Sequence, residues 1–211
     1  MIILGLTGSI GMGKTTAATA FRSLGVCVYD ADLAVHKLMA PDGEGVAKVL
    51  NIFPGVAKEG GIDRQALGAI VFADDSKLLQ LEKILHPLVR RKERAFLAAA
   101  ARRRERLVVL DIPLLLETGG DIRCDGVVVV SAPAMIQKSR VMQRPGMTAK
   151  RMQAIMDHQI DDEDKCHMAD FVVQTGLGRA HSLRAIANIV TVTKSWLPRH
   201  WPPVHNSREM A

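Results

Sequence analysis

Residues 8–15, Gly-Ser-Ile-Gly-Met-Gly-Lys-Thr, fit the pattern G-x-x-x-x-G-K-[ST] without a mismatch. An apolar run over residues 2–6 precedes them, and a helix-like segment over 16–21 follows. Glycines in such a loop let backbone N–H groups turn toward a di- or triphosphate, and the lysine adds a positive charge. The hydroxyl reaches Mg²⁺, and the following helix directs its positive dipole end at the anion. The predicted nucleotide contacts are Gly8, Gly11, Met12, Gly13, Lys14, Thr15 and Thr16.

Carboxylates follow two further apolar runs, where an open parallel sheet places its ligands. Asp30 and Asp32 follow the run over 26–29, and we expect one of them to face the phosphates if that strand neighbours the first. The other interpretation is an N-cap for a helix that begins near Leu33. Asp111 ends the run over 107–110 and is a candidate for holding Mg²⁺ through water, with a turn cap as the alternative.

Several cations are candidates for phosphate contacts. Arg140 and Arg144 are four residues apart, a spacing that puts both on one face of a predicted helix, and Arg151 follows in the same basic region. A solvated basic face is the alternative. His86 stands directly before Pro87, and the sequence pattern leaves its role open.

The elements that must position these residues alternate between strand and helix. Strands are predicted over 2–6, 26–29, 107–111, 126–130 and 171–173, which gives an α/β fold with a parallel five-stranded sheet flanked by helices. Helical patterns over 33–105 and 137–168 interrupt the sheet, and such excursions form acceptor-binding regions and lids in phosphoryl-transfer enzymes. In the first of them, Asp63 and Asp74 or Asp75 are predicted helix caps, and Pro87 is predicted in the first turn of a long helix.

The resulting domain division has a nucleotide-binding core over 1–32, 106–136 and 169–195, an acceptor region over 33–105, a lid over 137–168 and a tail over 196–211. The tail, which holds both tryptophans, is expected to be a loosely packed or disordered appendage.

Composition limits the possible partners. The net charge is +6, but aromatic residues make up only 4%, too few for a base-stacking platform, so nucleic acid is not an expected partner. No apolar run approaches the roughly 18–20 residues that span a bilayer, and the first residues lack a basic leader, so we expect a cytoplasmic protein without a membrane partner. The three cysteines are widely spaced and are expected to be free thiols. A monomer or weak homo-oligomer is expected.

Phosphoryl transfer needs positioned phosphates, a metal, an oriented nucleophile and cations, and the sequence offers a candidate for each. GTPase signatures do not occur at their expected places, and a motor ATPase is usually larger. A small-molecule kinase is the favoured class, and a nucleotide-sensing binding module without turnover is the alternative from another class.

The motifs together resemble the dephospho-coenzyme A kinase family. Residues 4–16 look like its opening G-L-T-G-G-I-G-S-G-K-S/T, residues 30–32 match D-A-D, 86–88 match H-P-L, and 113–117 match P-L-L-[FV]-E. Arg140, Arg144 and Ala169-Asp170 stand at the R…R and A-D signatures. The resemblance runs from residue 2 to about 190. Ser9 and Met12 depart from the family's Gly and Ser, and Gln174-Thr175-Gly176 replaces a common Asn-Gly pair.

This resemblance implies a P-loop NTPase-type core, a helical acceptor-binding insertion and a helical lid. It implies ATP as donor and transfer of its γ-phosphate to the ribose 3′-hydroxyl of dephospho-CoA, the last step of CoA synthesis. Asp32 would be the base, Lys14 and Thr15 would serve ATP and Mg²⁺, and Arg140 would contact the transferring phosphates with Arg144 on ATP. The expected acceptor contacts are Asp32, His86, Leu115 and Glu117, and the expected metal contacts are Thr15 and Asp111.

Overall fold

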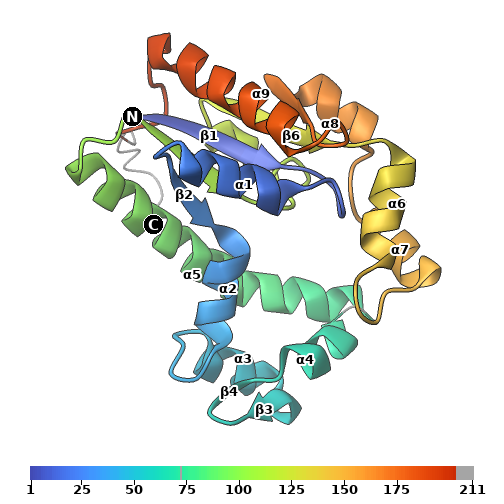
Figure 1. The fold of residues 1–211 in the computed structure, drawn as a ribbon. Helices are drawn as coiled ribbons and strands as arrows, with labels where there is room; N and C mark the ends of the chain where they lie inside the picture. Colours follow the sequence, from blue (N-terminus) through green and yellow to red (C-terminus); the bar gives the residue numbers. More distant parts are fainter. Residues whose placement is uncertain (72, 203–211) are drawn as a thin grey trace. The chain divides into compact units, whose positions relative to one another are not determined.

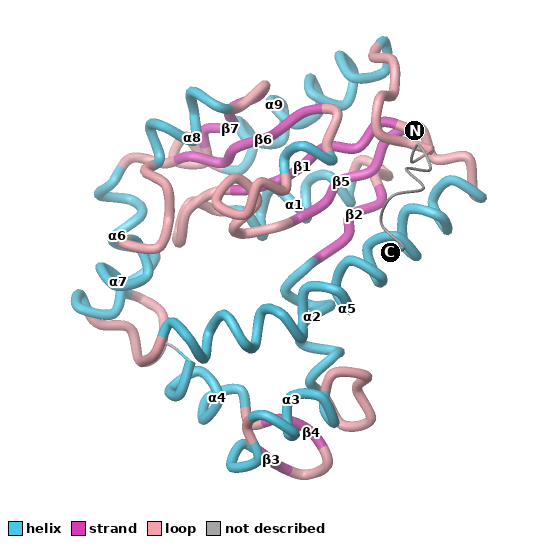
Figure 2. The backbone as a smooth tube through the Cα atoms, turned by 180° about the vertical axis from the view of Figure 1, so that it is seen from behind, coloured by secondary structure: helices cyan, strands magenta, loops and turns pink. Residues whose placement is uncertain are grey.

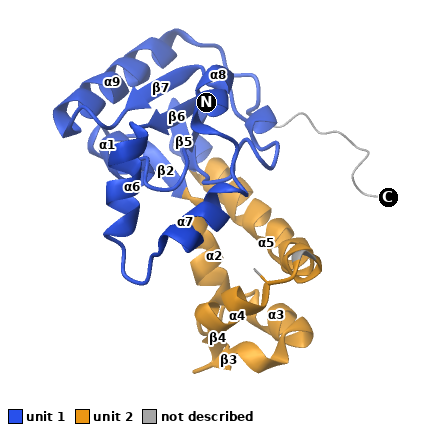
Figure 3. Ribbon diagram, turned by 90° about the vertical axis from the view of Figure 1, so that its right-hand side faces the viewer, with its two compact units in different colours: residues 1–29, 100–211 blue, residues 30–99 orange. Residues whose placement is uncertain are grey.

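The computed structural model describes residues 1–71 and 73–202 and forms two compact units (Figure 3). One unit comprises Met1–Tyr29 and the chain from Ala100 on, and the other comprises Asp30–Ala99. The elements of the first unit are β1 (Ile2–Thr7), α1 (Lys14–Ser23), β2 (Cys27–Asp30, whose last residue opens the other unit), β5 (Leu107–Asp111), the 3₁₀ turn η2 (Asp121–Arg123), β6 (Gly126–Ser131), α6 (Ala134–Met142), α7 (Ala149–Met156), α8 (Asp162–Met168), β7 (Phe171–Gln174), α9 (Arg179–Val192) and η3 (Thr193–Ser195).

The sheet of this unit has five strands in the order β2-β5-β1-β6-β7, seen in Figure 2. The strand β1 runs parallel to both β5 and β6, and β6 runs parallel to β7. This confirms the predicted α/β sheet. Because β5 lies between β1 and β2, the condition under which one acid of 30–32 was expected to face the phosphates, that their strand neighbours the first, is not met. One of the two strands that pair with β1 is β5, which ends at Asp111, and Asp111 is in register with Leu6 of β1.

Alternation along β1 assigns its two faces. Ile2, Leu4 and Leu6 join a buried cluster with Phe21 of α1 and Ile186 of α9, and these two helices lie side by side on the sheet (Figure 1). The other face has no room for a side chain at Gly5, because a Cβ there would lie 2.4 Å from Leu115 Cδ2.

The second unit contains α2 (Ala31–Met39), α3 (Val46–Ile52), the 3₁₀ turn η1 (Pro54–Val56), β3 (Ala57–Lys58), β4 (Gly61–Ile62), α4 (Arg64–Val71) and most of α5 (Asp75–Arg102). Its own buried cluster includes Val49, Val56 and Leu67. The purely helical reading of this region missed the antiparallel β3–β4 pair, whose strands have two residues each and carry no alternating pattern. Asp63 caps α4, as predicted, by accepting from the N–H groups of Gln65 and Ala66.

Pro87 lies inside α5 and not in its first turn, so the predicted helix start there is wrong. A proline inside a helix costs about 3 kcal/mol because it removes one backbone bond and crowds the preceding turn. Leu85 and Leu88 on either side of it are buried, and their packing offsets this cost. The helix instead begins next to Asp74, whose carboxylate accepts from the N–H of Ser76.

The start of the predicted tail also differs from expectation. Trp196 stacks on Phe171 of β7 with ring centroids 5.5 Å apart, and its ring covers Gly126 so closely that a Cβ would lie 2.7 Å away. Trp196 is therefore part of the packed unit and not of an appendage. The rest of the prediction for 203–211 lies outside the described residues.

Candidate active site

The phosphate loop connects the buried end of β1 to the start of α1. Gly11 and Gly13 have φ angles of +79° and +95°, which favour glycine, and Gly13 is the N-cap residue of α1. A Cβ at Gly11 would lie 2.5 Å from Val141 Cγ2, so this position has neither the conformation nor the space for a side chain. No side chain caps α1 and its first turn holds no acid, so its N-terminal N–H groups and dipole can act on an anion.

Lys14 forms an ion pair with Asp111 at the end of β5. The distance from Nζ to Oδ1 is 2.7 Å, and the two side chains are 17% and 4% exposed. The neighbouring strands β1 and β5 therefore bring together two residues that are 97 positions apart in the sequence. The hydroxyl-bearing Thr15 and Thr16 follow in the first turn of α1 and are exposed.

Arg140 of α6 contacts the loop from another side. Its Nη1 donates to Thr175 Oγ1 at 2.9 Å and to the Gly11 carbonyl at 3.4 Å, and its Nη2 donates to the Thr175 carbonyl at 2.9 Å. The buried Thr175 hydroxyl in turn donates to the carbonyl of Met12 at 2.5 Å. Arg144 lies beyond the end of α6 and is exposed, so the prediction that the two arginines share one helix face is wrong.

Two glutamines that sequence reasoning missed bind the backbone of Ile10 within the loop. Gln137 of α6 donates from Nε2 to the Ile10 carbonyl at 2.9 Å, and Gln159 accepts from the Ile10 N–H at 3.0 Å. Glutamine has no distinctive spacing in the sequence, and Gln137 is followed by the polar residues Lys138, Ser139 and Arg140, so no sequence signal pointed to either glutamine.

Glu117 contacts the segment that follows Gln159 and helix α8. Its Oε1 lies 2.7 Å from Nζ of Lys165 in α8 and accepts from the Ile160 N–H at 3.1 Å. Lys165 is completely buried and also donates to the hydroxyl of Ser9 in the loop at 3.2 Å. Leu115 is fully buried as well, and its side chain packs over Gly5 in the core, while its contact with the acceptor stays a prediction.

The remaining predicted residues belong to the second unit. Asp30 accepts from the Leu33 N–H at 2.8 Å and is the N-cap of α2, which confirms that one of the two acids caps this helix, and the reactive role of Asp32 stays a prediction. Asp32 lies in the first turn of α2 with an exposed side chain. His86 is exposed in α5.

Within the described residues, no group of three or more His, Cys, Asp or Glu side chains is placed to hold a metal ion. Mg²⁺ that is bound with nucleotide needs few protein ligands, because phosphates and water complete its shell. The Asp111 carboxylate and the Thr15 hydroxyl are oxygen donors of the kind this ion prefers, so the residues present fit it. The cysteines are free, as predicted.

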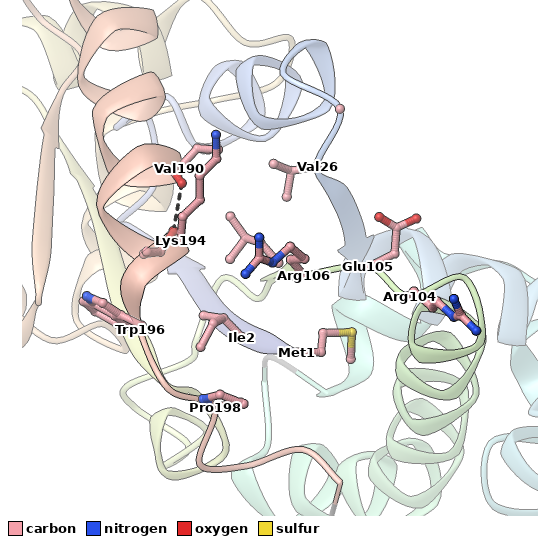
Figure 4. A pocket seen from close by; sticks show the side chains of 13 residues that line it. Met1, Ile2, Val26, Arg104, Glu105, Arg106, Val190, Lys194, Trp196 and Pro198 are labelled. Atoms are coloured by element: carbon pink, nitrogen blue, oxygen red, sulfur yellow. Dashed lines mark hydrogen bonds between the residues drawn. The ribbon is translucent and has the colours of Figure 1, made fainter.

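A hollow of about 460 Å³ lies elsewhere, at the amino ends of β1 and β5 (Figure 4). The residues that line it include Ile2, Val26 and Trp196, together with the cations Arg106 and Lys194. The phosphate loop and Asp111 lie at the opposite ends of these strands, their carboxyl ends. Open α/β sheets bind their ligands at the carboxyl ends of the strands. The chemistry is therefore assigned to the loop and not to this hollow.

A parallel α/β sheet whose first strand leads into a lysine-bearing phosphate loop defines a nucleotide-binding protein of the P-loop class. Comparison with known proteins narrows this class. The model of the family described as dephospho-CoA kinase matches residues 2–178. A dephospho-CoA kinase of Rhodospirillum rubrum is 52% identical over 201 residues, which are 95% of each chain.

Solved structures agree. The crystal structure of TT1252 from Thermus thermophilus is 34% identical with a TM-score of 0.79, over 90% of this chain and 96% of that one. A dephospho-CoA kinase from Campylobacter jejuni is 28% identical with a TM-score of 0.68, over 91% and 96%. This chain belongs to the dephospho-CoA kinase family.

Proposed function

We infer that this protein catalyses the ATP-dependent phosphorylation of dephospho-CoA, a step of CoA biosynthesis. The observation that carries this inference is the family match over residues 2–178, which includes a phosphate loop with Lys14 held against Asp111. The acceptor position is proposed to be the ribose 3′-hydroxyl, as the motif resemblance implies.

The proposed donor site is the loop with the N-terminus of α1. Backbone N–H groups of the loop and Lys14 bind the ATP phosphates, with Thr16 and the residues from Gly8 onward forming the cradle. Thr15 and Asp111 would hold Mg²⁺, the latter through water. When bound, this ion neutralises charge on the β- and γ-phosphates.

The proposed base is Asp32, which accepts or orients the proton of the acceptor hydroxyl. Its neighbour Asp30 is occupied as the helix cap, which supports assigning the reactive role to Asp32. We place His86 in the acceptor region, where the resemblance also puts Leu115 and Glu117.

Arg140 and Arg144 are proposed to bind phosphate groups from the lid side. The guanidinium of Arg140 already lies against the Gly11 carbonyl, so its charge is at the loop where the phosphates are expected. A fixed cation at that point stabilises charge that develops during transfer. Arg144 is exposed outside α6, and its proposed contact with ATP requires that this segment close on the nucleotide.

The test of the base is Asp32→Asn, with Asp30→Asn as the matched control. Asparagine caps a helix about as well as aspartate, so the control keeps α2 intact. We expect Asp32→Asn to lose turnover while its ATP affinity, measured by titration calorimetry, stays within about threefold of wild type. A large loss of ATP affinity, or full turnover in the variant, would contradict the role.

The helices of the described chain include none that is long and apolar enough to cross a membrane. A cytoplasmic location, the absence of a nucleic-acid partner and a monomeric or weakly oligomeric state remain part of the proposal and rest on composition.

A further inference from the structure

A buried ion pair lies behind the phosphate loop and joins three segments that are distant in the sequence. Lys165 Nζ bridges Glu117 Oε1 at 2.7 Å and Ser9 Oγ at 3.2 Å, and the lysine residue is 0% exposed. A lysine is almost never buried to this degree unless it is paired, because removing its charge from water is costly. The ion pair with Glu117 is therefore needed to keep the Lys165 charge in the interior, unlike an ion pair on the surface.

The orientation of Glu117 follows from its partners. Oε1 is shared between Lys165 and the Ile160 N–H, and Oε2 is buried with no hydrogen-bond partner among the described residues. The residue before Ile160, Gln159, accepts from the Ile10 N–H of the loop. Glu117 thus holds both Lys165, which contacts Ser9, and the segment whose Gln159 binds Ile10. Both partners of Glu117 are therefore connected to the phosphate loop.

Ser9 gives this chain a contact that the family pattern lacks. The usual residue at this loop position is glycine, which has no hydroxyl for Lys165 to reach. Ser9 is only 7% exposed, and its carbonyl accepts from the Met12 N–H at 3.1 Å, so the tether acts on a residue that closes the loop's own turn. A loop whose backbone N–H groups must converge on phosphates gains affinity when its shape is set before binding.

We propose that Lys165 is a positioning residue for ATP: with Glu117 it anchors the phosphate loop through Ser9, so that Glu117 serves the donor side of the reaction and not the acceptor. This inference rests on the proposed function only for the identity of the two substrates. Lys165 touches neither substrate directly and acts through the shape of the loop.

The experiment measures KM for ATP and for dephospho-CoA separately, together with thermal unfolding. Ser9→Ala keeps the ion pair and removes the tether, so we expect KM for ATP to rise about threefold to tenfold, the loss of one hydrogen bond. KM for dephospho-CoA should stay unchanged, and the unfolding temperature should fall less than in Lys165→Met, because the Glu117 charge keeps its cation. Lys165→Met is expected to raise KM for ATP more than tenfold and to lower the unfolding temperature, because it leaves the Glu117 charge buried without its cation.

A double variant, Glu117→Gln with Lys165→Met, removes both charges and keeps the proposal testable if the single lysine variant fails to fold. We expect it to regain stability while KM for ATP stays high, because the tether to Ser9 is still missing. Lys194→Met is the matched control, because Lys194 is exposed and lies near the amino ends of β1 and β5, away from the phosphate loop. This variant should change neither KM.

Two results would overturn the proposal. A rise in KM for dephospho-CoA with no change for ATP would return Glu117 to the acceptor site, and loss of stability with both constants unchanged would make the pair merely structural. Turnover of dephospho-CoA by the wild-type protein tests the proposed function independently. Failure of the proposed function is therefore distinguishable from failure of the positioning role of Lys165.

Discussion

The hydroxyl of Thr175 is a buried connection between the phosphate loop and helix α6, and its removal gives a quantitative test. It donates to the Met12 carbonyl at 2.5 Å and accepts from Arg140 Nη1 at 2.9 Å. The first bond is neutral and contributes about 1 kcal/mol, and the second involves a charged donor and contributes about 1.5–3 kcal/mol. Arg140 keeps the Thr175 carbonyl as a partner, so the expected loss is about 2–3 kcal/mol.

The assay compares Thr175→Ala with Thr175→Ser. Both variants lose the same methyl group, and only the alanine variant loses the hydroxyl, so their difference isolates the hydrogen bonds of that hydroxyl, which also lies 3.3 Å from the Ser131 carbonyl. For a chain of this size, about 2–4 °C of unfolding temperature corresponds to 1 kcal/mol, so the alanine variant should melt about 5–10 °C below the serine variant. Equal unfolding free energies in urea, within about 0.5 kcal/mol, would refute the reasoning.

Three further outcomes are expected. Lys14→Ala should abolish ATP use, measured as ADP release, and full activity would remove the loop from the mechanism. The Asp63 carboxyl has a lowered pKa because the N–H groups of Ala66 and Gln65 donate to it, so its folded pKa lies below the unfolded one. Its stabilisation of α4 is present above the unfolded pKa and is lost as pH falls through the folded pKa. The difference in unfolding free energy between wild type and Asp63→Ala, measured in urea titrations, should therefore shrink below about pH 4. A difference that stays constant below this pH would contradict the helix cap. Burial, and to a smaller extent the nearby Asp162 charge, raises the pKa of the Cys166 thiol. The rate of its alkylation, followed by mass spectrometry, should therefore still increase with pH above about pH 8.5. A rate that levels off below that pH would contradict this environment.

The sequence allowed prediction of those parts of the site that depend on local patterns. The phosphate loop has fixed spacing, and the five strands are apolar runs, so both were predicted and the sheet is confirmed. The helix cap at Asp63 was predicted for the same reason, since a capping carboxylate acts on N–H groups two or three residues away.

Strand order and long-range contacts could not be predicted in this way. Nothing in the apolar run before Asp30 shows that β5 separates it from β1, because neighbouring strands are set by packing and crossover connections. Pro87 misled the prediction of a helix start, because burial of its neighbours overrides its local cost.

Lys165 illustrates the limit most clearly. It stands in an acidic helix where a lysine usually faces solvent, yet it is fully buried against Ser9, which lies 156 residues away in the sequence. Such a contact has no local periodicity, so only the folded chain shows it. Leu115 and Glu117 belong to one predicted motif, but the structure separates them into a core residue and a charged partner of the loop network.

The central claim is tested most directly by following ATP consumption by the purified protein with dephospho-CoA and, separately, with other small hydroxyl acceptors such as a nucleoside and a sugar acid. The account predicts Mg²⁺-dependent turnover with dephospho-CoA, appearance of CoA by mass spectrometry, and little turnover with the other acceptors. Turnover of another acceptor without any reaction of dephospho-CoA would contradict it.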